Sequence, residues 1–442
     1  MKLFGTDGLR ATAGAFPLDP ESLRLLGREL GRRLPRGSDR CVVLGGDTRE
    51  STAGMIGELA QGLTEGGCRP AHAGTVPTPA VAELVLALGA GAGISVSASH
   101  NPYEDNGVKI FGPDGRKLPD SEEEALEAAL LAAQGAAEST RGLAPPPPVD
   151  PRLAERYLER LAPHASGSMA GLPIVLDAGH GAAFRLGPEA LRRAGARVHL
   201  LHAEPDGRNI NRDCGALHPE GMAAETKTRG AALGVALDGD ADRSIFSDEQ
   251  GRILDGDDVL WILARDWKRR GRLAEGGVVG TVMSNYGLES ALAREGIAFH
   301  RAAVGDRNVA RKMEETGAVL GGETSGHILQ PFSPSGDGIL TTLLLASVVV
   351  ENGGSLSALA TLQKSPQALR NVRAARRVPI DGDSAIGAAA ERAAARLSSR
   401  GRVFLRYSGT EPLLRILVEG PEAAEVRAIA DDLERTAREA MA

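Results

Sequence analysis

The sequence has few cysteines and no strong excess of charge, and each of these absences narrows the class of protein. It contains three cysteines in 442 residues, an odd number without the spacing of a metal-binding motif: Cys41, Cys68 and Cys214. This pattern indicates reduced thiols and a cytoplasmic location. The net charge is −7 and 25% of the residues are charged, a balance that does not favour a general nucleic-acid-binding protein.

The sequence also has no apolar run long enough for a membrane-directed segment. Its first residues, Met-Lys-Leu-Phe-Gly-Thr-Asp, contain no apolar stretch of signal-peptide length. The most apolar run, residues 339–350, is too short to span a bilayer and predicts a buried helix. We therefore expect neither a membrane nor a nucleic acid among the partners of this protein.

The length of the chain predicts several domains. A chain of 442 residues exceeds one ordinary hydrophobic core. Strands and helices alternate in three segments of similar length, which predicts three related α/β domains, and the last segment is typical of a smaller α+β domain. Four prolines at residues 145–148 cannot continue a helix and mark the first boundary as a stiff linker. The predicted domains are residues 1–144, 150–252, 253–366 and 369–442.

Local patterns predict strands and helices within these domains. Strands are expected at residues 42–47, 174–177, 198–201, 233–237, 277–282, 403–405 and 416–418. Helices are expected at residues 51–65, 121–134, 187–194, 257–270, 384–399 and 421–440. Ligand sites at the carboxyl ends of such strands would fit the rule for open α/β sheets.

Residues 94–109, with the sequence ISVSASHNPYEDNGVK, contain a candidate nucleophile. The alternating apolar run ends in small hydroxylated residues and the turn pair Asn101-Pro102, which predicts Ser99 at the exposed end of a strand. A seryl oxygen there can attack or carry a phosphoryl group, and the alternative is a strand followed by an Asx-Pro turn. A hydrolase triad is not favoured, because Ser99 and His100 are adjacent and triad partners usually come from separate segments.

Three aspartates at alternate positions, Asp238, Asp240 and Asp242, follow the short apolar run at residues 233–237. Three ionised carboxylates this close together repel one another unless a divalent cation binds, and hard oxygen ligands suit Mg²⁺ or Ca²⁺. An EF-hand is one alternative, but Arg243 occupies the loop position where the sharp turn needs Gly. A solvated acidic turn is another. Arg243 favours a strand-end Mg²⁺ site, because a cation beside a metal suggests a shared anionic ligand such as phosphate.

Two further loops carry polar groups between glycines. In residues 321–327, GGETSGH, Glu323 and Ser325 could bind vicinal hydroxyls and His327 could move protons, although such polar turns are common. In residues 406–415, RYSGTEPLLR, two arginines, two hydroxyls and a glycine could surround a phosphate. The alternative for the second loop is an ordinary connection between two strands.

Together, these four segments resemble the α-D-phosphohexomutase superfamily, and the resemblance extends almost from end to end. It also includes FGTDGLR at residues 4–10, GTVMSN at residues 280–285 and VGDR at residues 304–307. The form SGTEP in the last loop is similar to the glucosamine branch of that superfamily. Small departures, none of which removes a functional group, occur at three positions: Ala11, Ala241 and Thr324.

The resemblance implies an isomerase with three related α/β domains and a smaller C-terminal domain around a central cleft. It implies interconversion of glucosamine 6-phosphate and glucosamine 1-phosphate, a supply for UDP-N-acetylglucosamine and cell-wall precursors. Ser99 would carry the phosphoryl group and glucosamine 1,6-bisphosphate would be the intermediate and activator. One Mg²⁺ would be held by Ser99, Asp238, Asp240 and Asp242. A glucose or mannose phosphate mutase with the same mechanism is the nearest alternative.

The resemblance also implies roles for single residues. Lys109 and His327 are expected to transfer protons and stabilise the leaving group, with cationic neighbours lowering the lysine pKa, although simple phosphate anchoring and turn packing are the alternatives. Arg243 is expected to position the phosphoryl group. The expected substrate-binding residues are Arg10, Glu323, Ser325, Arg406, Ser408, Gly409, Thr410 and Arg415.

Two other classes of protein would use some of the same residues. A sugar-phosphate-binding protein without turnover is disfavoured, because the serine, the three aspartates, the lysine and the histidine occur together. A metal-dependent phosphatase with a serine nucleophile would release inorganic phosphate instead. The expected partner is a small sugar phosphate, and the expected oligomeric state is a monomer or a homodimer.

Overall fold

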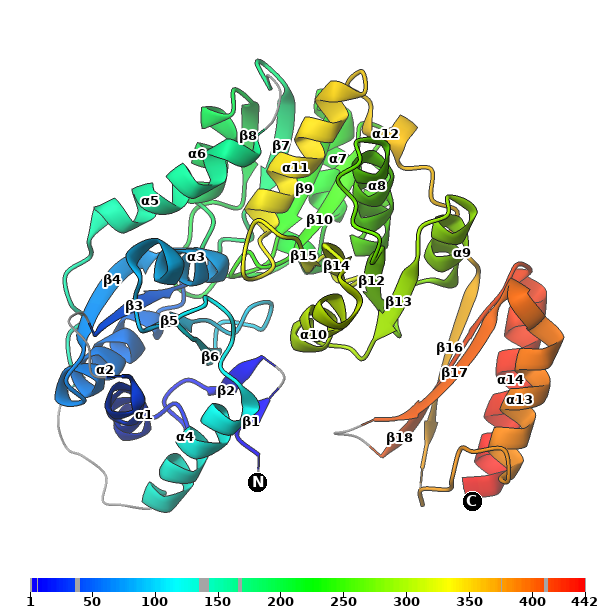
Figure 1. The fold of residues 1–442 in the computed structure, drawn as a ribbon, viewed down its shortest axis with the longest axis horizontal. Coiled ribbons are helices and arrows are strands. Elements are labelled where there is room, and N and C mark those ends of the chain that lie inside the picture. The colour runs from blue at the N-terminus through cyan, green and yellow to red at the C-terminus, as the bar shows by residue number, and fades with distance from the viewer. Residues whose placement is uncertain are drawn as a thin grey trace. The chain divides into compact units, whose positions relative to one another are not determined.

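The computed structural model describes residues 2–5, 7–35, 40–134, 143–165, 169–374, 376–408 and 412–441 (Figure 1). The chain divides into two compact units. The first comprises Met1–Met283 and Ala298–Thr361, and the second comprises Ser284–Ile297 and Leu362–Ala442. In the described parts of both units the strands form four sheets, three in the first unit and one in the second.

The first sheet has the strand order β1-β2-β6-β5-β3-β4. Its strands are β1 (Phe4–Gly5), β2 (Gly8–Thr12), β3 (Cys41–Gly46), β4 (Arg69–Thr75), β5 (Ala92–Val96) and β6 (Asp105–Phe111). The helices around it are α1 (Pro20–Arg33), α2 (Thr52–Glu65), α3 (Thr78–Leu88), α4 (Asp120–Ala133) and α5 (Pro151–Leu161). Apolar side chains of α1, α2 and α4 form one core against β3, β5 and β6, and α3 covers the opposite face and packs on α5 (Figure 1).

The second sheet has the order β11-β10-β9-β7-β8. Its strands are β7 (Pro173–Asp177), β8 (Arg197–Leu201), β9 (Leu233–Leu237), β10 (Ser244–Asp248) and β11 (Ile253–Leu254). Helix α7 (Glu220–Arg229) packs on β7, β9 and β10. Helix α6 (Leu186–Arg193) packs on β8, and α11 (Gly338–Glu351) returns from later in the chain to contact β9, β10 and α6.

The third sheet has the order β13-β12-β14-β15. Its strands are β12 (Val278–Thr281), β13 (Phe299–Ala302), β14 (Leu320–Gly322) and β15 (Ile328–Leu329). Helix α10 (Asp306–Thr316) packs on β12, β13 and β14, and α8 (Gly256–Arg269) contacts β12 and β14. The short helix α12 (Leu356–Leu359) follows α11 near the end of this unit.

The three sheets of the first unit share one strand order. In each, the first parallel strand lies between the second and the third, and a fourth strand pairs antiparallel with the third: β4-β3-β5-β6, β8-β7-β9-β10 and β13-β12-β14-β15. This order confirms three related α/β domains. The loop between the third and fourth strands therefore occupies an equivalent place in all three: residues 97–104, 238–243 and 323–327.

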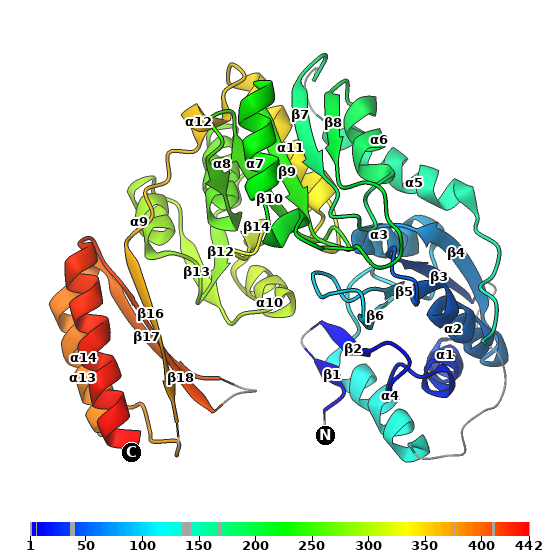
Figure 2. The ribbon, with the colours of Figure 1, turned by 180° about the vertical axis from the view of Figure 1, so that it is seen from behind.

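The second unit is a small α+β fold. Its antiparallel sheet has the order β16-β18-β17. The elements are β16 (Gln367–Arg373), β17 (Arg402–Tyr407), β18 (Leu413–Glu419), α9 (Tyr286–Arg294), α13 (Ala385–Leu397) and α14 (Ala423–Met441). Figure 2 shows α13 and α14 on one face of this sheet, where α14 packs on β16 and β18.

The expected elements are present, with ends that shift by up to three residues. The expected fold class, three α/β domains and a smaller C-terminal α+β domain, is confirmed. The domain boundaries and the central cleft stay predictions. No helix within the described ranges is long and apolar enough to cross a membrane.

The predicted buried helix at residues 339–350 is α11, and a buried carboxyl caps its start. The Asp337 side chain accepts hydrogen bonds from the N–H groups of Ile339 (2.9 Å) and Leu340 (3.0 Å), and the Tyr157 hydroxyl donates to its other oxygen at 2.8 Å. Asp337 and Tyr157 are fully buried. Burial raises the pKa of Asp337 to about 7, against the opposing effect of these hydrogen bonds.

We expect this carboxyl to make the fold less stable as the pH rises from about 5 to 8. Folding raises its pKa from 3.8 to about 7, so its stabilising effect is complete at low pH and is lost as the pH rises through about 7. The full shift corresponds to about 4 kcal/mol. The melting temperature of the unmodified protein should therefore fall more over this range than that of Asp337→Asn, which stays neutral.

The matched control is Asp114→Asn at an exposed turn, which should keep the pH dependence of the unmodified protein. An Asp337→Asn protein whose melting temperature varies with pH as much as that of the unmodified protein would contradict this account.

Candidate active site

The structure brings together the serine loop, the acidic loop and Lys109, which come from separate segments of the first unit. The Ser99 hydroxyl donates a hydrogen bond to Asp238 Oδ2 at 2.6 Å. Lys109 Nζ, on β6, donates to Asp240 Oδ2 and to Asp242 Oδ2, both at 2.8 Å. Ser99, Lys109 and the three aspartates are all buried. The predicted association of these residues in one site agrees with these contacts.

The serine loop is held in a conformation that few side chains adopt. Ser99 has a φ of +53°, in the left-handed region. Its N–H donates to Ser97 Oγ at 2.9 Å, and Ser97 Oγ donates to Asp47 Oδ2 at 2.6 Å. The buried Arg49 pairs with Asp47 and donates to the carbonyl oxygens of Ser99 (3.2 Å) and Asn101 (2.5 Å). This network fixes the direction of the Ser99 hydroxyl. A local Asx-Pro turn alone does not account for these buried contacts.

Two expectations about exposure are wrong. The sequence predicts Ser99 at an exposed strand end and allows a solvated acidic turn, but Ser99 is 0% exposed and Asp238, Asp240 and Asp242 are 1%, 1% and 4% exposed. The domains of the first unit pack over the strand ends and cover both loops. The EF-hand is also excluded, because strands β9 and β10 rather than helices flank the acidic loop.

The three carboxylates fit a divalent cation. Their oxygens lie within 4.8 Å of one another. Asp240 Oδ1 and Asp242 Oδ1 are buried and have no hydrogen-bond partner among the described residues. Burial and the charges of Asp242 and Asp240 raise the pKa of Asp238 well above its usual range. A hard divalent cation would coordinate these unpaired oxygens and reduce the repulsion between the carboxylates.

Lys109 differs from the expectation that cationic neighbours lower its pKa. Its closest partners are carboxylates, Asp240 and Asp242 at 2.8 Å and Asp7 at 3.0 Å. Although burial opposes the charge, these carboxylates hold the pKa of Lys109 well above its usual value. The expected depression of its pKa is therefore wrong, because the neighbouring carboxylates favour the charged form of Lys109.

His327 lies at the same cluster, in the equivalent loop of the third domain. Its Nδ1 is 3.6 Å from Asp242 Oδ1 and its Nε2 is 3.8 Å from Asp306 Oδ2. Burial opposes the imidazolium, but the Asp242 carboxylate and then that of Asp306 raise the pKa of His327. Gly336 lies against the imidazole ring, where an added Cβ would come 2.5 Å from Nε2. Any larger residue at position 336 would therefore displace this ring.

The rest of the predicted sugar loop is less buried. Glu323 Oε1 accepts a hydrogen bond from Gly305 N–H at 2.9 Å, and Ser325 is exposed. Gly326 has a φ of +88° and packs directly on the Ser244 carbonyl, so the turn requires glycine there. Glu323 and Ser325 are therefore accessible to a ligand, unlike the buried carboxylates.

Two arginines lie around the serine loop. Arg243 Nη1 is 3.2 Å from His100 Nδ1, and His100 Nδ1 is 3.3 Å from Ser99 Oγ. Arg10, on β2, donates to the Ala98 carbonyl and pairs with Asp7 at 2.5 Å. Both arginines are partly exposed, at 22% and 24% of their side chains. They are therefore placed to contact an anion that reaches Ser99.

The predicted phosphate loop lies in the second unit. Arg406 and Arg415 are directly opposite each other on β17 and β18, so their side chains lie on the same face of the sheet. Ser408 N–H donates to the Leu413 carbonyl at 2.8 Å and closes the hairpin end. Gly409 and Thr410 lie outside the described residues.

Several residues at this site were not assigned a role from the sequence. Asp7 and Asp306 occur in segments that carry the resemblance, and Lys117 Nζ joins them at 2.6 Å and 2.7 Å. Thr78, at the start of α3, donates from its hydroxyl to Asp240 Oδ2 at 2.7 Å. Arg49 holds the serine loop, as described above. In the sequence these residues are marked only by a polar side chain that follows a buried strand or begins a helix. This pattern is too common to identify functional residues.

A serine held at a carboxylate cluster, at equivalent loops of three repeated α/β domains, is the arrangement of a phosphohexomutase. Models of the phosphoglucomutase/phosphomannomutase domains I, II, III and C-terminal domain match residues 1–136, 155–251, 255–365 and 357–436. The chain belongs to the phosphoglucomutase/phosphomannomutase family. It is a mutase, and mutases are isomerases.

Within that family the chain belongs to the phosphoglucosamine mutase branch. It is 46% identical to a phosphoglucosamine mutase of Thermus thermophilus, over 100% of this chain and 99% of the relative. It is 44% identical to phosphoglucosamine mutase of Koribacter versatilis, over 100% of this chain and 97% of the relative.

Solved structures have the same fold. A phosphoglucomutase/phosphomannomutase family protein of Burkholderia thailandensis has a TM-score of 0.81 at 25% identity and covers 99% of this chain and 97% of its own. N-acetylphosphoglucosamine mutase of Aspergillus fumigatus, solved with GlcNAc-6P and magnesium, has a TM-score of 0.63 at 19% identity, with coverage of 100% and 96%. The second likeness concerns the fold alone.

We expect Asp240→Asn to weaken divalent-cation binding without unfolding the protein. Asparagine keeps an oxygen for the Thr78 hydroxyl and Lys109 Nζ but removes one negative charge from the cluster. The affinity for Mg²⁺, measured by calorimetric titration, should fall at least about tenfold, the lower end of losses for outer metal partners. The exposed residue Asp213 lies in the same domain, and Asp213→Asn should bind Mg²⁺ normally. Unchanged Mg²⁺ affinity in Asp240→Asn would remove the cluster as the cation site.

Proposed function

We propose that this enzyme interconverts glucosamine 6-phosphate and glucosamine 1-phosphate through a phosphorylated Ser99. The observation that carries the proposal is the Ser99 hydroxyl, 2.6 Å from one carboxylate of a buried cluster that fits a cation. The similarity to phosphoglucosamine mutases along the full chain supports the glucosamine substrate. The product would supply UDP-N-acetylglucosamine and cell-wall precursors.

The reaction needs two phosphoryl transfers in opposite directions. In the first, the O1 hydroxyl of glucosamine 6-phosphate attacks the phosphorus of phosphoserine, the bond to Ser99 Oγ breaks, and Oγ takes up a proton. The product is glucosamine 1,6-bisphosphate, which we also propose as the activator. The sugar then reverses its orientation and Ser99 Oγ loses its proton and attacks the 6-phosphoryl group. The bond between that phosphorus and O6 breaks, O6 takes up a proton, and glucosamine 1-phosphate leaves the enzyme, which again carries phosphoserine.

Fixed positive charges stabilise the transferring group. Lys109 stays protonated among Asp240, Asp242 and Asp7, so we propose that it acts through its charge and does not shuttle a proton. Arg243 contacts the phosphoryl oxygens from the side of His100. One Mg²⁺ held by Asp238, Asp240, Asp242 and a phosphoserine oxygen would neutralise further charge when bound.

His327 is the proposed proton carrier. The carboxylates of Asp242 and Asp306 favour its imidazolium form, which makes it a proton donor to a departing oxygen. Its side chain is buried, which limits the access of bulk water to the imidazole. The same imidazole accepts a proton from the attacking sugar hydroxyl during the transfer from phosphoserine to the sugar.

Sugar and phosphate contacts are assigned to the more exposed loops. We propose that Glu323 and Ser325 bind the sugar hydroxyls in both orientations and that Arg10 contacts the phosphoryl group near Ser99. In the second unit, Arg406, Ser408, Gly409, Thr410 and Arg415 are proposed to bind the phosphate that does not react. The opposed pair Arg406 and Arg415 supports this role, because two neighbouring guanidinium groups can both donate charge-assisted hydrogen bonds to one phosphate.

The nearest alternative is a mutase of glucose or mannose phosphates with the same chemistry. The residues that read the amino group at C2 are not identified by the contacts above, so substrate preference has to be measured. We further propose a cytoplasmic enzyme, since none of the three cysteines forms a disulfide in the described chain. Cell fractionation tests that location, and the monomeric or homodimeric state stays a prediction that light scattering can check.

The covalent intermediate can be tested directly. Intact mass and peptide mapping should find one phosphoryl group on a fraction of the purified enzyme, at Ser99. Ser99→Ala should remain folded, and its turnover should be at least about a thousandfold lower, since removal of a nucleophile has effects of that size or larger.

Substrate preference is measured with glucosamine, glucose and mannose 6-phosphates, each assayed with Mg²⁺ and a trace of bisphosphate. Glucosamine 6-phosphate should have the highest kcat/KM.

Phosphate mapped to Ser95 or Ser97, or full turnover by Ser99→Ala, would exclude this mechanism. A higher kcat/KM for glucose or mannose 6-phosphate would keep the mechanism and replace the substrate.

The phosphate role of the second unit has its own test. Loss of a charge-assisted bidentate contact costs about 1.5–3 kcal/mol, roughly ten- to a hundredfold in binding. Arg415→Ala should therefore raise KM for the monophosphate and release free 1,6-bisphosphate during turnover. Arg370→Ala is the control, because Arg370 lies in the same sheet and pairs with Asp431 at 2.7 Å. If KM and bisphosphate release match those of Arg370→Ala, the loop does not bind the phosphate.

A further inference from the structure

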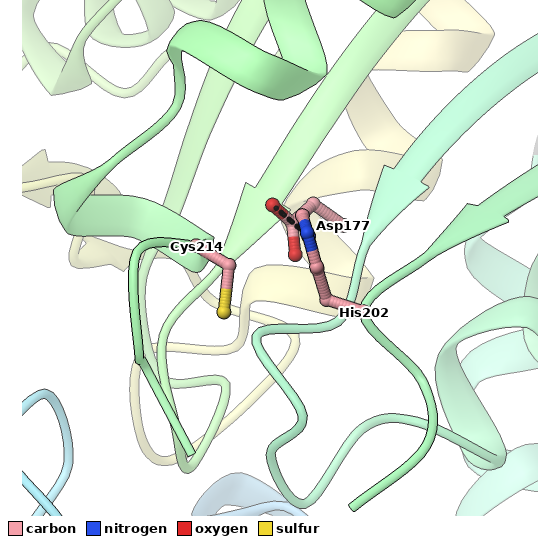
Figure 3. Close-up of side chains that lie close together, drawn as sticks. All are labelled: Asp177, His202 and Cys214. Atoms are coloured by element: carbon pink, nitrogen blue, oxygen red, sulfur yellow. Dashed lines mark ion pairs between the residues drawn. The ribbon is translucent and has the colours of Figure 1, made fainter. Parts of the chain in front are cut away.

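A second group of metal-ligating side chains lies in the second domain, distinct from the three aspartates. Asp177 ends β7, His202 follows β8, and Cys214 directly precedes the 3₁₀ turn Gly215–Leu217. Figure 3 shows the three side chains coming together from these separate segments, and their ligand atoms lie within 4.8 Å of one another. Asp177 and Cys214 are buried, whereas the His202 side chain is 37% exposed and leaves a path to solvent.

A comparison with Asp47 of the first domain shows what is unusual about Asp177. Asp47 directly follows β3 and Asp177 is the last residue of β7, and each accepts a hydrogen bond from the N–H two residues later. Asp47 is neutralised by the buried guanidinium of Arg49. Among the described residues no Lys or Arg forms an ion pair with Asp177. Its oxygens accept from the N–H groups of Gly179 (2.8 Å) and Gly215 (3.0 Å) instead.

The other two side chains also have unused ligand atoms. His202 Nδ1 is 3.0 Å from Asp177 Oδ2, yet it is buried and makes no hydrogen bond of acceptable geometry within the described ranges. Cys214 is a free, buried cysteine, and its Sγ lies within 4.8 Å of the ligand atoms of Asp177 and His202. A carboxylate without a cation, an unbonded ring nitrogen and a thiol therefore share one small space.

We propose that Asp177, His202 and Cys214 bind one thiophilic divalent cation, of which Zn²⁺ is the biological example. Mixed oxygen, nitrogen and sulfur ligands favour Zn²⁺ over Mg²⁺, whereas the three aspartates of the active site favour Mg²⁺. Ligand atoms around a tetrahedral Zn²⁺ lie roughly 3.3–3.6 Å apart. Here His202 Nδ1 and Asp177 Oδ2 are 3.0 Å apart and no pair exceeds 4.8 Å, so side-chain shifts of about 1 Å are sufficient. A metal–sulfur bond forms, the thiol proton passes to solvent, and water takes the fourth position.

The position of this site suggests a structural role beside the serine loop. The segment that carries Cys214 also carries Asn211, whose Nδ2 donates to the carbonyl oxygens of Ser99 (3.0 Å) and Asn101 (3.2 Å). A cation joining Cys214 to the ends of β7 and β8 would hold this segment against the second sheet. The ion would therefore stabilise the support of the serine loop without contacting the substrate.

Cobalt absorption tests the site independently of the proposed reaction. Co²⁺ is added to the reduced, full-length protein in excess Mg²⁺, which occupies the site of the three aspartates. A thiolate-to-cobalt charge-transfer band should grow to saturation at one equivalent and disappear when Zn²⁺ is added. Cys214→Ser should lose the band. His202→Ala should keep the band, but its affinity for Co²⁺ should fall by more than about 100-fold. Loss of a residue that only supports a metal ligand typically costs about 10–100-fold.

Three control variants should give the same thiolate-to-cobalt band as the unmodified protein. Cys68→Ser removes another buried thiol, and His199→Ala removes a histidine of β8. Asp240→Asn alters the active-site cluster but should leave the cobalt band unchanged, which separates this site from the catalytic one. The proposal is overturned by the absence of a thiolate band in the unmodified protein, by a band that survives Cys214→Ser, or by unchanged Co²⁺ affinity in His202→Ala.

Discussion

Three carboxylates buried within 4.8 Å of one another repel strongly, and the arrangement of the first unit depends on how that repulsion is balanced. Lys109 contributes one positive charge in contact with two of the aspartates, and His327 and Arg243 approach from other segments. Removing a single partner would leave an uncompensated charge in the interior. This constraint explains why residues of three domains meet here and why two carboxylate oxygens stay available for a cation.

The domain repeat places the functional loops. Each α/β domain reverses direction between its third and fourth strands, and that reversal carries the serine in the first domain, the aspartates in the second and the histidine in the third. The same connection therefore has three different chemical roles. The ends of β3 and β7 differ in how their buried aspartates are surrounded: Asp47 pairs with the guanidinium of Arg49, whereas His202 lies beside Asp177.

Much of the local structure could be predicted from the sequence. The strand ending before Ser99, the strand before Asp238 and the apolar helix α11 are each determined by patterns within a few residues, and all three are present. The candidate site could be predicted only in part. Arg49, Thr78 and Lys117 were not assigned roles, because their contacts join segments far apart in the chain.

The sequence by itself determined the family, the order of strands and helices, and the chemical groups available for phosphoryl transfer, because motifs and periodicity are properties of neighbouring residues. Only the tertiary structure decided burial, ion pairing and protonation. Lys109 was expected to have a lowered pKa, but packing placed it among carboxylates 131 and 133 positions away, which raise it. The distance and dielectric between groups so far apart depend on how the domains pack, and no local pattern encodes them.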